Sequence, residues 1–123
     1  MPASQAGRSD PCCVEVPTRN GRALISAAEA TELMALFKVL ANDSRLRLLH
    51  ALICAKELCV TSLARAVGMK PQAVSNQLQR LADRGIVRAR RQGNTVYYRV
   101  VNQCVTDLLD RGLCLIENGC PSP

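Results

Sequence analysis

Cysteine is the residue type with the most evident chemistry in this chain. The sequence holds seven cysteines among 123 residues but only one histidine, His50. Thiolates are soft ligands that favour thiophilic or borderline ions over magnesium or calcium. In reducing compartments thiols more often bind metal or sense redox state than form disulfides, and an odd number of cysteines does not fit a closed disulfide framework. The cysteines therefore indicate metal binding or redox sensing.

Patterns that most enzymes require are absent from the sequence. It has one histidine, no Gly-rich phosphate loop and no G-x-S-x-G elbow, which excludes most hydrolases, kinases and dinucleotide-binding enzymes. Its three aromatic residues, Phe37, Tyr97 and Tyr98, are too few for the stacking surfaces that bind single-stranded nucleic acid. We therefore expect a protein that is not an enzyme.

Length and composition fit one soluble globular domain. The chain is 48% hydrophobic and 21% charged, which is enough apolar material to bury one core. Sixteen lysines and arginines against ten aspartates and glutamates give a net charge of +6, which favours an anionic partner. No apolar run is long enough for a membrane helix, and the first twenty residues lack the apolar stretch of a signal peptide. We expect a cytoplasmic protein that does not bind membranes.

Composition divides the chain into three segments. Residues 1–22 are rich in Pro, Gly, Ser and Arg without periodicity, and are predicted to form a flexible N-terminal arm that carries Cys12 and Cys13. We place the folded domain at residues 23–117 and a C-terminal tail at 118–123.

Helical periodicity and capping residues predict two helices at the start of the folded domain. Ser26 and Glu29 have the spacing of a capping box and precede apolar residues at helical spacing, which predicts a helix over 26–41. Asn42 can cap a second helix, on which His50 lies. A lone histidine of this kind is more often a core or boundary residue than a ligand, and we interpret His50 in this way. Cys54 lies in the same apolar helix, where we expect a small buried hydrophobe.

The middle of the sequence predicts a helix, a tight turn and a second helix. Thr61 or Ser62 can cap the first, Gly68 can end it, and Pro71 suits the first turn of the next. One face of the second helix is apolar. A polar stripe on another face consists of Gln72, Ser75, Asn76 and Gln79.

After Gly85 the pattern changes to that of β-strands. Residues 86–90 and 95–100 flank the turn residues Gln92-Gly93-Asn94, which predicts a β-hairpin with a basic tip. Helical spacing resumes at Val101 and continues to about Arg111.

The helix-turn-helix and the hairpin are strongly basic. Residues 70–99 contain seven lysines and arginines against Asp83 alone, so this segment carries as much net charge as the whole chain. The polar stripe can present amides and a hydroxyl to base edges in a major groove, while cations contact phosphates and the hairpin acts as a wing. The alternative is a merely solvated helix face, but the combination with a basic hairpin favours DNA binding. The predicted DNA contacts are Lys70, Gln72, Ser75, Asn76, Gln79, Arg80, Arg90, Arg91 and Asn94.

Four segments, in this order and spacing, resemble the ArsR/SmtB winged-helix repressors. They are LANDSRLRLL at 40–49, ELCV at 57–60, PQAVSNQL at 71–78 and RQGNTVYY at 91–98. The resemblance covers about residues 26–111 and implies a mainly α fold with a small β-hairpin, a dimeric winged helix-turn-helix. It also implies a homodimer, joined by the first and last helices, that binds operator DNA and is released by a metal or metalloid ion.

The resemblance also points to a thiol site. The cadmium- and lead-sensing repressors of the family combine the cysteine of ELCV, here Cys59, with cysteines of the N-terminal arm. Some relatives carry a further cysteine where this chain has Thr61, so we predict three thiolates, from Cys12, Cys13 and Cys59, rather than four. Such a set suits Hg(II), Pb(II) or As(III), and holds Cd(II) with an added ligand.

Other sites and functions remain open at this point. A second candidate metal site consists of Cys104, Cys114 and Cys120. The zinc site that some relatives carry on the last helix is not supported, because no histidine follows Asp107 and Asp110, so zinc is less expected as effector. The alternative functions are a thiol-based redox-sensing repressor of the same fold and an architectural DNA-binding protein whose cysteines are incidental.

Overall fold

The computed structural model describes residues 15–118 of the chain. Contacts divide the described residues into two compact units, one up to Leu36 and one from Phe37 onward, and we describe each by itself. The predicted arm and tail boundaries therefore remain predictions. Cys12, Cys13 and Cys120 lie outside the described residues.

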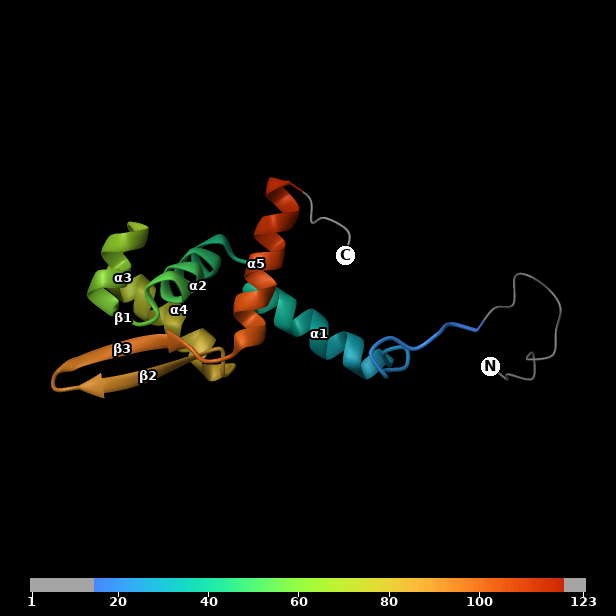
Figure 1. Cartoon of the computed structure of the whole chain (residues 1–123). Helices are drawn as coiled ribbons and strands as arrows, with labels where there is room; N and C mark the ends of the chain where they lie inside the picture. Colours follow the sequence, from blue (N-terminus) through green and yellow to red (C-terminus); the bar gives the residue numbers. More distant parts are fainter. Residues whose placement is uncertain (1–14, 119–123) are drawn as a thin grey trace. The chain divides into compact units, whose positions relative to one another are not determined.

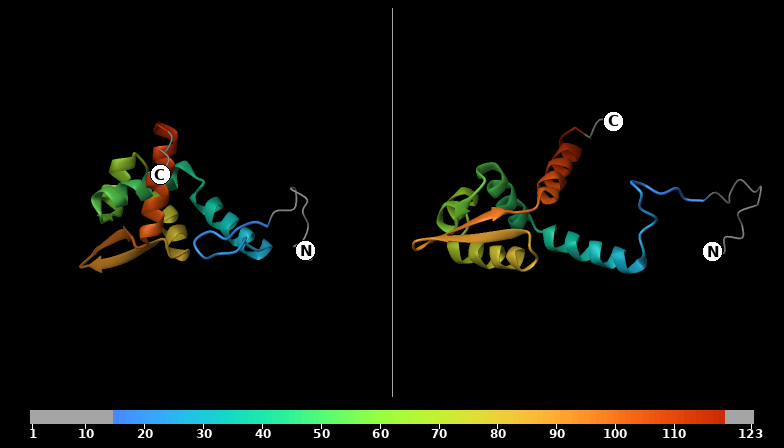
Figure 2. Two further views of the ribbon diagram at one scale, coloured as in Figure 1. Left: turned by 45° about the vertical axis from the view of Figure 1, so that its right-hand side comes forward. Right: turned by 60° about the horizontal axis from the view of Figure 1, so that its bottom comes forward.

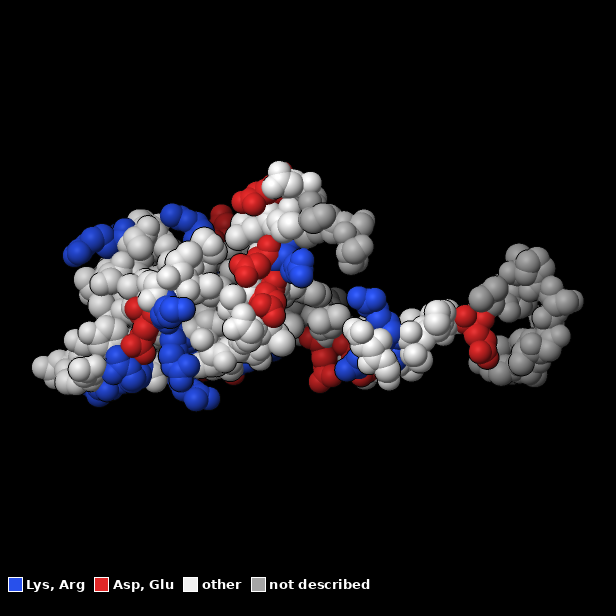
Figure 3. Space-filling view, viewed as in Figure 1, with Lys and Arg blue, Asp and Glu red and all other residues white. Residues whose placement is uncertain are grey.

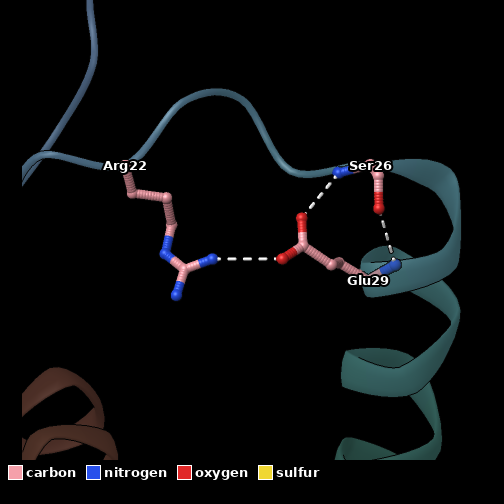
Figure 4. Close-up of polar contacts among 3 residues, drawn as sticks. All are labelled: Arg22, Ser26 and Glu29. Carbon is pink, nitrogen blue, oxygen red and sulfur yellow. Dashed lines mark hydrogen bonds and ion pairs between the residues drawn. The ribbon is translucent and has the colours of Figure 1, made fainter.

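Helix α1 (Ala27–Leu40) begins with the predicted capping box (Figure 4). The backbone N–H of Glu29 donates to the Ser26 hydroxyl oxygen at 3.1 Å, and the Ser26 N–H donates to the Glu29 carboxylate at 2.9 Å. Each bond satisfies a backbone donor at the start of the helix that has no partner within it. Arg22, which the sequence did not single out, pairs with the same carboxylate at 3.2 Å.

Helix α2 (Asp43–Ala55) is capped as predicted, since the Asn42 side chain accepts a hydrogen bond from the Arg45 N–H at 3.0 Å. The expectation that Cys54 is buried in this helix is wrong, because its side chain is exposed. His50 is exposed as well. The core face of α2 is formed by Leu48, Leu49 and Leu52, which are fully buried, and helical geometry turns His50 and Cys54 away from it.

Helices α3 (Val60–Val67) and α4 (Pro71–Asp83) form the predicted helix-turn-helix. Gly68 ends α3 in the left-handed conformation, with φ of 68°, and its N–H bonds to the Ala64 carbonyl. A residue with a Cβ is strained at such a φ, so glycine suits this position. Pro71 opens α4 as expected. The predicted cap of α3 is wrong, because Cys59 rather than Thr61 or Ser62 occupies that position.

The core lies between α2, α3 and α4 (Figure 1). Among the described residues, no buried side-chain nitrogen or oxygen lacks a hydrogen-bond partner. The core of the described residues is therefore apolar and contains no side-chain polar group without a hydrogen-bond partner. Its fully buried side chains are Leu48, Leu49, Leu52, Leu63, Leu78, Leu81 and Val74.

The predicted hairpin is part of a three-stranded antiparallel sheet. Strands β2 (Val87–Gln92) and β3 (Thr95–Val100) form the hairpin, and β1 (Leu58–Cys59) pairs with the other edge of β3. Figure 2 shows the hairpin running beside α4, which contacts β2. The two-residue strand β1 has no alternating pattern, so the sequence did not predict it. The turn itself, Gly93-Asn94, is uncharged, and the arginines lie along the strands rather than at the tip.

Helix α5 (Gln103–Glu117) is longer than the sequence predicted and is capped by the Asn102 side chain, which accepts from the Cys104 N–H at 2.8 Å. Val105 and Leu109 are buried, whereas several apolar residues farther along α5 are exposed. Together with α2 they border an open apolar hollow of about 790 Å³ within the second unit. Lining residues include Phe37, Leu46, His50, Leu108, Leu113 and Ile116. Within residues 15–118, no helix is long and apolar enough to span a membrane.

The core predicts a specific stability difference between two leucines. Leu52→Ala removes a fully buried side chain and should lower the free energy of unfolding by about 2–5 kcal/mol, because of the cavity left behind. Leu24→Ala, at a side chain that is 77% exposed, should change it by less than about 0.5 kcal/mol. Urea unfolding at one fixed protein concentration measures both, and equal losses would contradict the assigned core.

Candidate metal centre and nucleic-acid interface

Cys59 lies where β1 ends and α3 begins. It occupies the N-cap position of α3 and is half-buried. Its Sγ lies 3.4 Å from the hydroxyl oxygen of Ser62, three residues farther along. The backbone of β1 and the start of the helix therefore place this sulfur at a fixed point of the helix-turn-helix.

Hydrogen bonding at this point lowers the pKa of Cys59. The Ser62 hydroxyl is the largest cause, and the backbone N–H groups of Ser62 and Thr61 act in the same direction, while desolvation of the sulfur by burial opposes them. These donors stabilise the thiolate over the thiol, as the start of a helix does in general. The thiolate is the form that binds metal and that oxidants attack, so Cys59 is chemically suited to either role.

The same sheet joins Cys59 to the wing. Cys59 pairs with Tyr97 on β3, and Tyr97 pairs with Arg90 on β2, so the three residues lie in one row across the sheet. The Arg90 guanidinium lies 5.0 Å from the centre of the Tyr97 ring, a cation–π contact. Cys59 therefore lies two strands away from a basic residue of the wing, in the same row of the sheet.

Glu57 holds Arg90 in place from the segment just before β1. The Arg90 guanidinium donates to the two carboxylate oxygens of Glu57 at 2.7 and 3.0 Å, a bidentate pair. This pairing lowers the pKa of Glu57. Both side chains are partly exposed, so the pair fixes orientation more than it adds stability. The predicted phosphate contact Arg90 is thus already engaged within the chain.

The polar stripe of α4 lies where the sequence predicts it. Val74, Leu78 and Leu81 are buried, and the stripe residues lie away from them. Gln72, Asn76 and Gln79 are exposed and Ser75 is half-buried. Gln72 donates to the Asn76 side chain at 3.1 Å, and Gln79 donates to Asp83 at 2.9 Å. These are exposed amides that can exchange their intramolecular bonds for bonds to a ligand.

Gln77, a residue of α4 outside the stripe, contacts Arg45 of α2. The Arg45 guanidinium donates to the Gln77 side chain at 2.7 Å and to the Val39 carbonyl at 2.9 Å. Gln77 is half-buried, so it does not belong to the exposed stripe. The orientation of α4 is therefore fixed by one polar contact in addition to its apolar face.

Basic residues extend along the hairpin. Arginine side chains gather over the strands, whereas the end of the hairpin is uncharged (Figure 3). The predicted phosphate contacts are all exposed: Lys70, Arg80, Arg90 and Arg91, together with Asn94. The stripe and the basic strands have the chemistry of a nucleic-acid interface, in which cations position the protein and amides distinguish bases.

The cysteines of α5 are far apart on one helix. Cys104 is exposed in its first turn and Cys114 is half-buried near its end. Ten residues of α-helix separate their positions by roughly 15 Å along the axis, too far for one ion to bind both in one chain. Within residues 15–118, no group of three His, Cys, Asp or Glu side chains is arranged to hold a metal. Both predicted thiol sites therefore require cysteines beyond the described residues or from a second chain.

The sequence did not predict the contacts of three residues around the thiol and the wing, Ser62, Glu57 and Tyr97. Ser62 has a local signal, since a residue three positions after an N-cap lies beside the cap side chain. Glu57 has no local signal, because its partner Arg90 is 33 residues away in the sequence. Tyr97 has none either, because its strand partner Cys59 is far away in the sequence.

The helix-turn-helix followed by a β-hairpin defines a winged helix-turn-helix protein. Residues 42–89 match the family described as bacterial regulatory protein, arsR family. The HTH-type transcriptional regulator NmtR of Mycobacterium tuberculosis is 35% identical over 89 residues, which cover 72% of this chain and 73% of NmtR. The chain belongs to the arsR family of bacterial regulatory proteins, which confirms the predicted resemblance.

Similar proteins extend this comparison. The cadmium resistance transcriptional regulatory protein CadC of Listeria innocua is 26% identical over 102 residues, covering 83% of this chain and 86% of CadC. The crystal structure of the antimony-specific transcriptional repressor AntR is 65% identical, with a TM-score of 0.74, covering 85% of this chain and 95% of AntR. A homodimeric winged helix-turn-helix DNA-binding domain from Mycobacterium bovis is 33% identical, with a TM-score of 0.65, covering 80% of this chain and 91% of its own. These relatives are transcriptional regulators rather than enzymes.

The hydrogen bond at Cys59 predicts a pH-dependent reactivity. Ser62→Ala removes the largest cause of the lowered pKa, so the midpoint of Cys59 alkylation should move to higher pH. Ser62→Thr keeps a hydroxyl and should stay close to the original profile. Alkylation rates across pH, resolved for each cysteine by peptide mass spectrometry, measure the shift. The profile of Cys104 in the same samples is the control, and an unchanged midpoint in Ser62→Ala would contradict the assigned cause.

Proposed function

We propose that the protein is a metal-responsive transcriptional repressor. It binds operator DNA as a homodimer and releases it when a thiophilic ion binds to cysteine thiolates. The observation that carries the proposal is Cys59, a thiol of lowered pKa at the start of the helix-turn-helix and in the same sheet as the wing. The names of relatives support a thiophilic effector, since they include cadmium, arsenic and antimony regulators.

The apolar hollow supports the homodimer. Apolar residues of α5 are exposed, among them Leu115 with 66% and Ile116 with 77% of the residue accessible to solvent. Together with the lining of the hollow they form an exposed apolar surface. A second copy would cover it, as the homodimeric relative from Mycobacterium bovis suggests. A dimer places two α4 helices on one face of the DNA, about one helical turn apart.

The DNA contacts are divided by chemistry. Gln72, Ser75, Asn76 and Gln79 of α4 would read base edges in the major groove. Lys70, Arg80 and Arg91 would contact phosphates, while Asn94 at the end of the hairpin would reach the flanking backbone or minor groove. Arg90 would join them when phosphate competes with Glu57 for its guanidinium.

The first candidate metal site combines Cys59 with Cys12 and Cys13. Three thiolates suit Hg(II), Pb(II) or the trivalent metalloids As(III) and Sb(III), and hold Cd(II) with an added ligand. A bound ion would tie the N-terminal segment to the start of α3 and, through β1 and β3, bias the wing.

The second candidate site consists of Cys104, Cys114 and Cys120. Because Cys104 and Cys114 are ten residues apart on α5, this site needs thiols from both chains of the dimer. An ion there would act on the dimer contact rather than on the wing.

The energies are sufficient for either site. Moving DNA occupancy from 99:1 to 1:99 takes about 5.5 kcal/mol of differential binding. Thiolate-rich zinc sites yield about 10–16 kcal/mol of apparent binding free energy. Linkage requires that DNA weaken metal binding by the same factor that metal weakens DNA binding.

A thiol-based redox sensor of the same fold is the second candidate function. The lowered pKa of Cys59 favours it as well, because the thiolate is the form that peroxide oxidises. Release of DNA by peroxide in the presence of a metal chelator, with no release by any metal ion, would favour this function.

The DNA interface predicts different effects for two exposed residues. Arg91→Ala should weaken binding to all duplexes alike and reduce the slope of log affinity against log salt by about 1, because one phosphate contact is lost. Asn76→Ala should keep the slope and cost about 1–3 kcal/mol on the preferred sequence only. Fluorescence anisotropy on the DNA upstream of the protein's own gene and on a scrambled duplex measures both. A reduced slope of log affinity against log salt in Asn76→Ala would contradict the assigned roles.

The thiol sites predict which variants lose the metal response. In anaerobic anisotropy titrations of the reduced protein on its operator, Hg(II), Cd(II), Pb(II), As(III) and Sb(III) are added separately, with Zn(II) for comparison. We expect release at about one equivalent per protomer by at least one ion. Cys59→Ser should bind DNA but no longer respond, whereas Cys104→Ser should respond normally. The reverse pattern would assign the effector to α5, and no release by any ion would contradict a metal-responsive repressor.

A further inference from the structure

His50 and Cys54 lie one helical turn apart on α2, outside both proposed thiol sites. The Cys54 sulfur is 3.8 Å from Nδ1 and 3.7 Å from Nε2 of His50. Both side chains are exposed. Residues at positions i and i+4 share one face of a helix, so the two groups open in the same direction.

The core of the protein fixes the direction of this pair. Leu48, Leu49 and Leu52 are fully buried, which prevents α2 from turning about its axis. The pair thus lies on a helix rather than on a loop. Both side chains can therefore reach one ion without a rearrangement of the backbone. Ligands held on rigid elements lose little freedom when they bind an ion.

The separation of the two groups matches an edge of a tetrahedral metal site. Zinc lies about 2.3 Å from a cysteine sulfur and about 2.0–2.1 Å from a histidine nitrogen, so tetrahedral angles place sulfur and nitrogen about 3.6 Å apart. The observed 3.7 Å is close to this value. The sulfur is almost equally far from both ring nitrogens, so neither lone pair points at it, and a rotation of the exposed His50 side chain is needed to turn one nitrogen toward an ion held by the sulfur.

We propose that His50 and Cys54 form a two-ligand site for a borderline divalent cation of the zinc type. One imidazole and one thiolate are the ligand types such ions prefer. No third His, Cys, Asp or Glu joins the pair within residues 15–118, so water completes the coordination. Binding displaces the thiol proton of Cys54 to solvent, and the thiolate offsets one of the two positive charges of the ion. The site shares no ligand with the proposed effector sites.

The location of the pair gives the site a consequence for assembly. His50 and Arg47 both line the apolar hollow of the second unit. An ion held at His50 adds positive charge to the lining of that hollow, which already contains Arg47. Occupancy and covering of the hollow by a second copy therefore influence one another.

The test follows the reactivity of each cysteine in the full-length, reduced and metal-free protein. Zn(II) is added stepwise, and alkylation of every cysteine is measured by peptide mass spectrometry. We expect saturating Zn(II) to slow alkylation of Cys54 by about tenfold or more, since metal-bound thiolate is withdrawn from reaction. His50→Gln, an exposed substitution of similar size, should lose most of this protection. Mg(II) should give none, because it avoids thiolate.

Two variants, His50→Gln and Cys59→Ser, separate this site from a simple thiol–imidazole hydrogen bond and from the effector site. Equal protection of Cys54 by Zn(II) in the original protein and in His50→Gln, or no protection in either, would overturn the proposal. Cys59→Ser should leave the protection of Cys54 intact, which distinguishes failure here from failure of the proposed repressor function. Loss of Cys54 protection in Cys59→Ser would also overturn it, because the pair would then not act on its own.

Discussion

The packing of α2 against α3 and α4 is the constraint on which the rest of the structure depends. Leu48, Leu49 and Leu52 of α2 are fully buried, and close packing leaves no room for the helix to turn or slide. With that face of α2 buried in the core, the other faces of α2 and α4 are free to meet solvent, a ligand or a second copy. The amides of α4 and the pair His50 and Cys54 of α2 are exposed for the same reason.

Much of the fold was predictable because its signals are local. The capping box at Ser26 and Glu29, the cap at Asn42 and the stop at Gly68 each involve residues within a few positions of one another. The faces of α2 were harder to predict, because apolar residues surround most of that helix. Which of its leucines face inward depends on α3 and α4, and this relation is not written in α2 itself.

The site was predictable in its residue types but not in its contacts. The sequence pointed to Cys59 and to the stripe of α4. Cys59 lies at the start of α3 and the stripe lies away from the buried face of α4, while their roles stay predictions. The ion pair between Glu57 and Arg90 joins residues 33 positions apart, so no local sequence pattern predicts it. It also gives Arg90 a partner within the chain, through which Arg90 connects the wing with the segment before Cys59.

The shortness of β1 has a consequence for motion. Two residue pairs join it to β3, so separating them breaks few hydrogen bonds and exposes little apolar surface. Such a local opening costs far less free energy than unfolding of the core formed by α2, α3 and α4, which stays closed throughout. The strand that carries Cys59 is thus joined to the sheet by a short contact, and a ligand bound there would alter how long this contact stays open without opening the core.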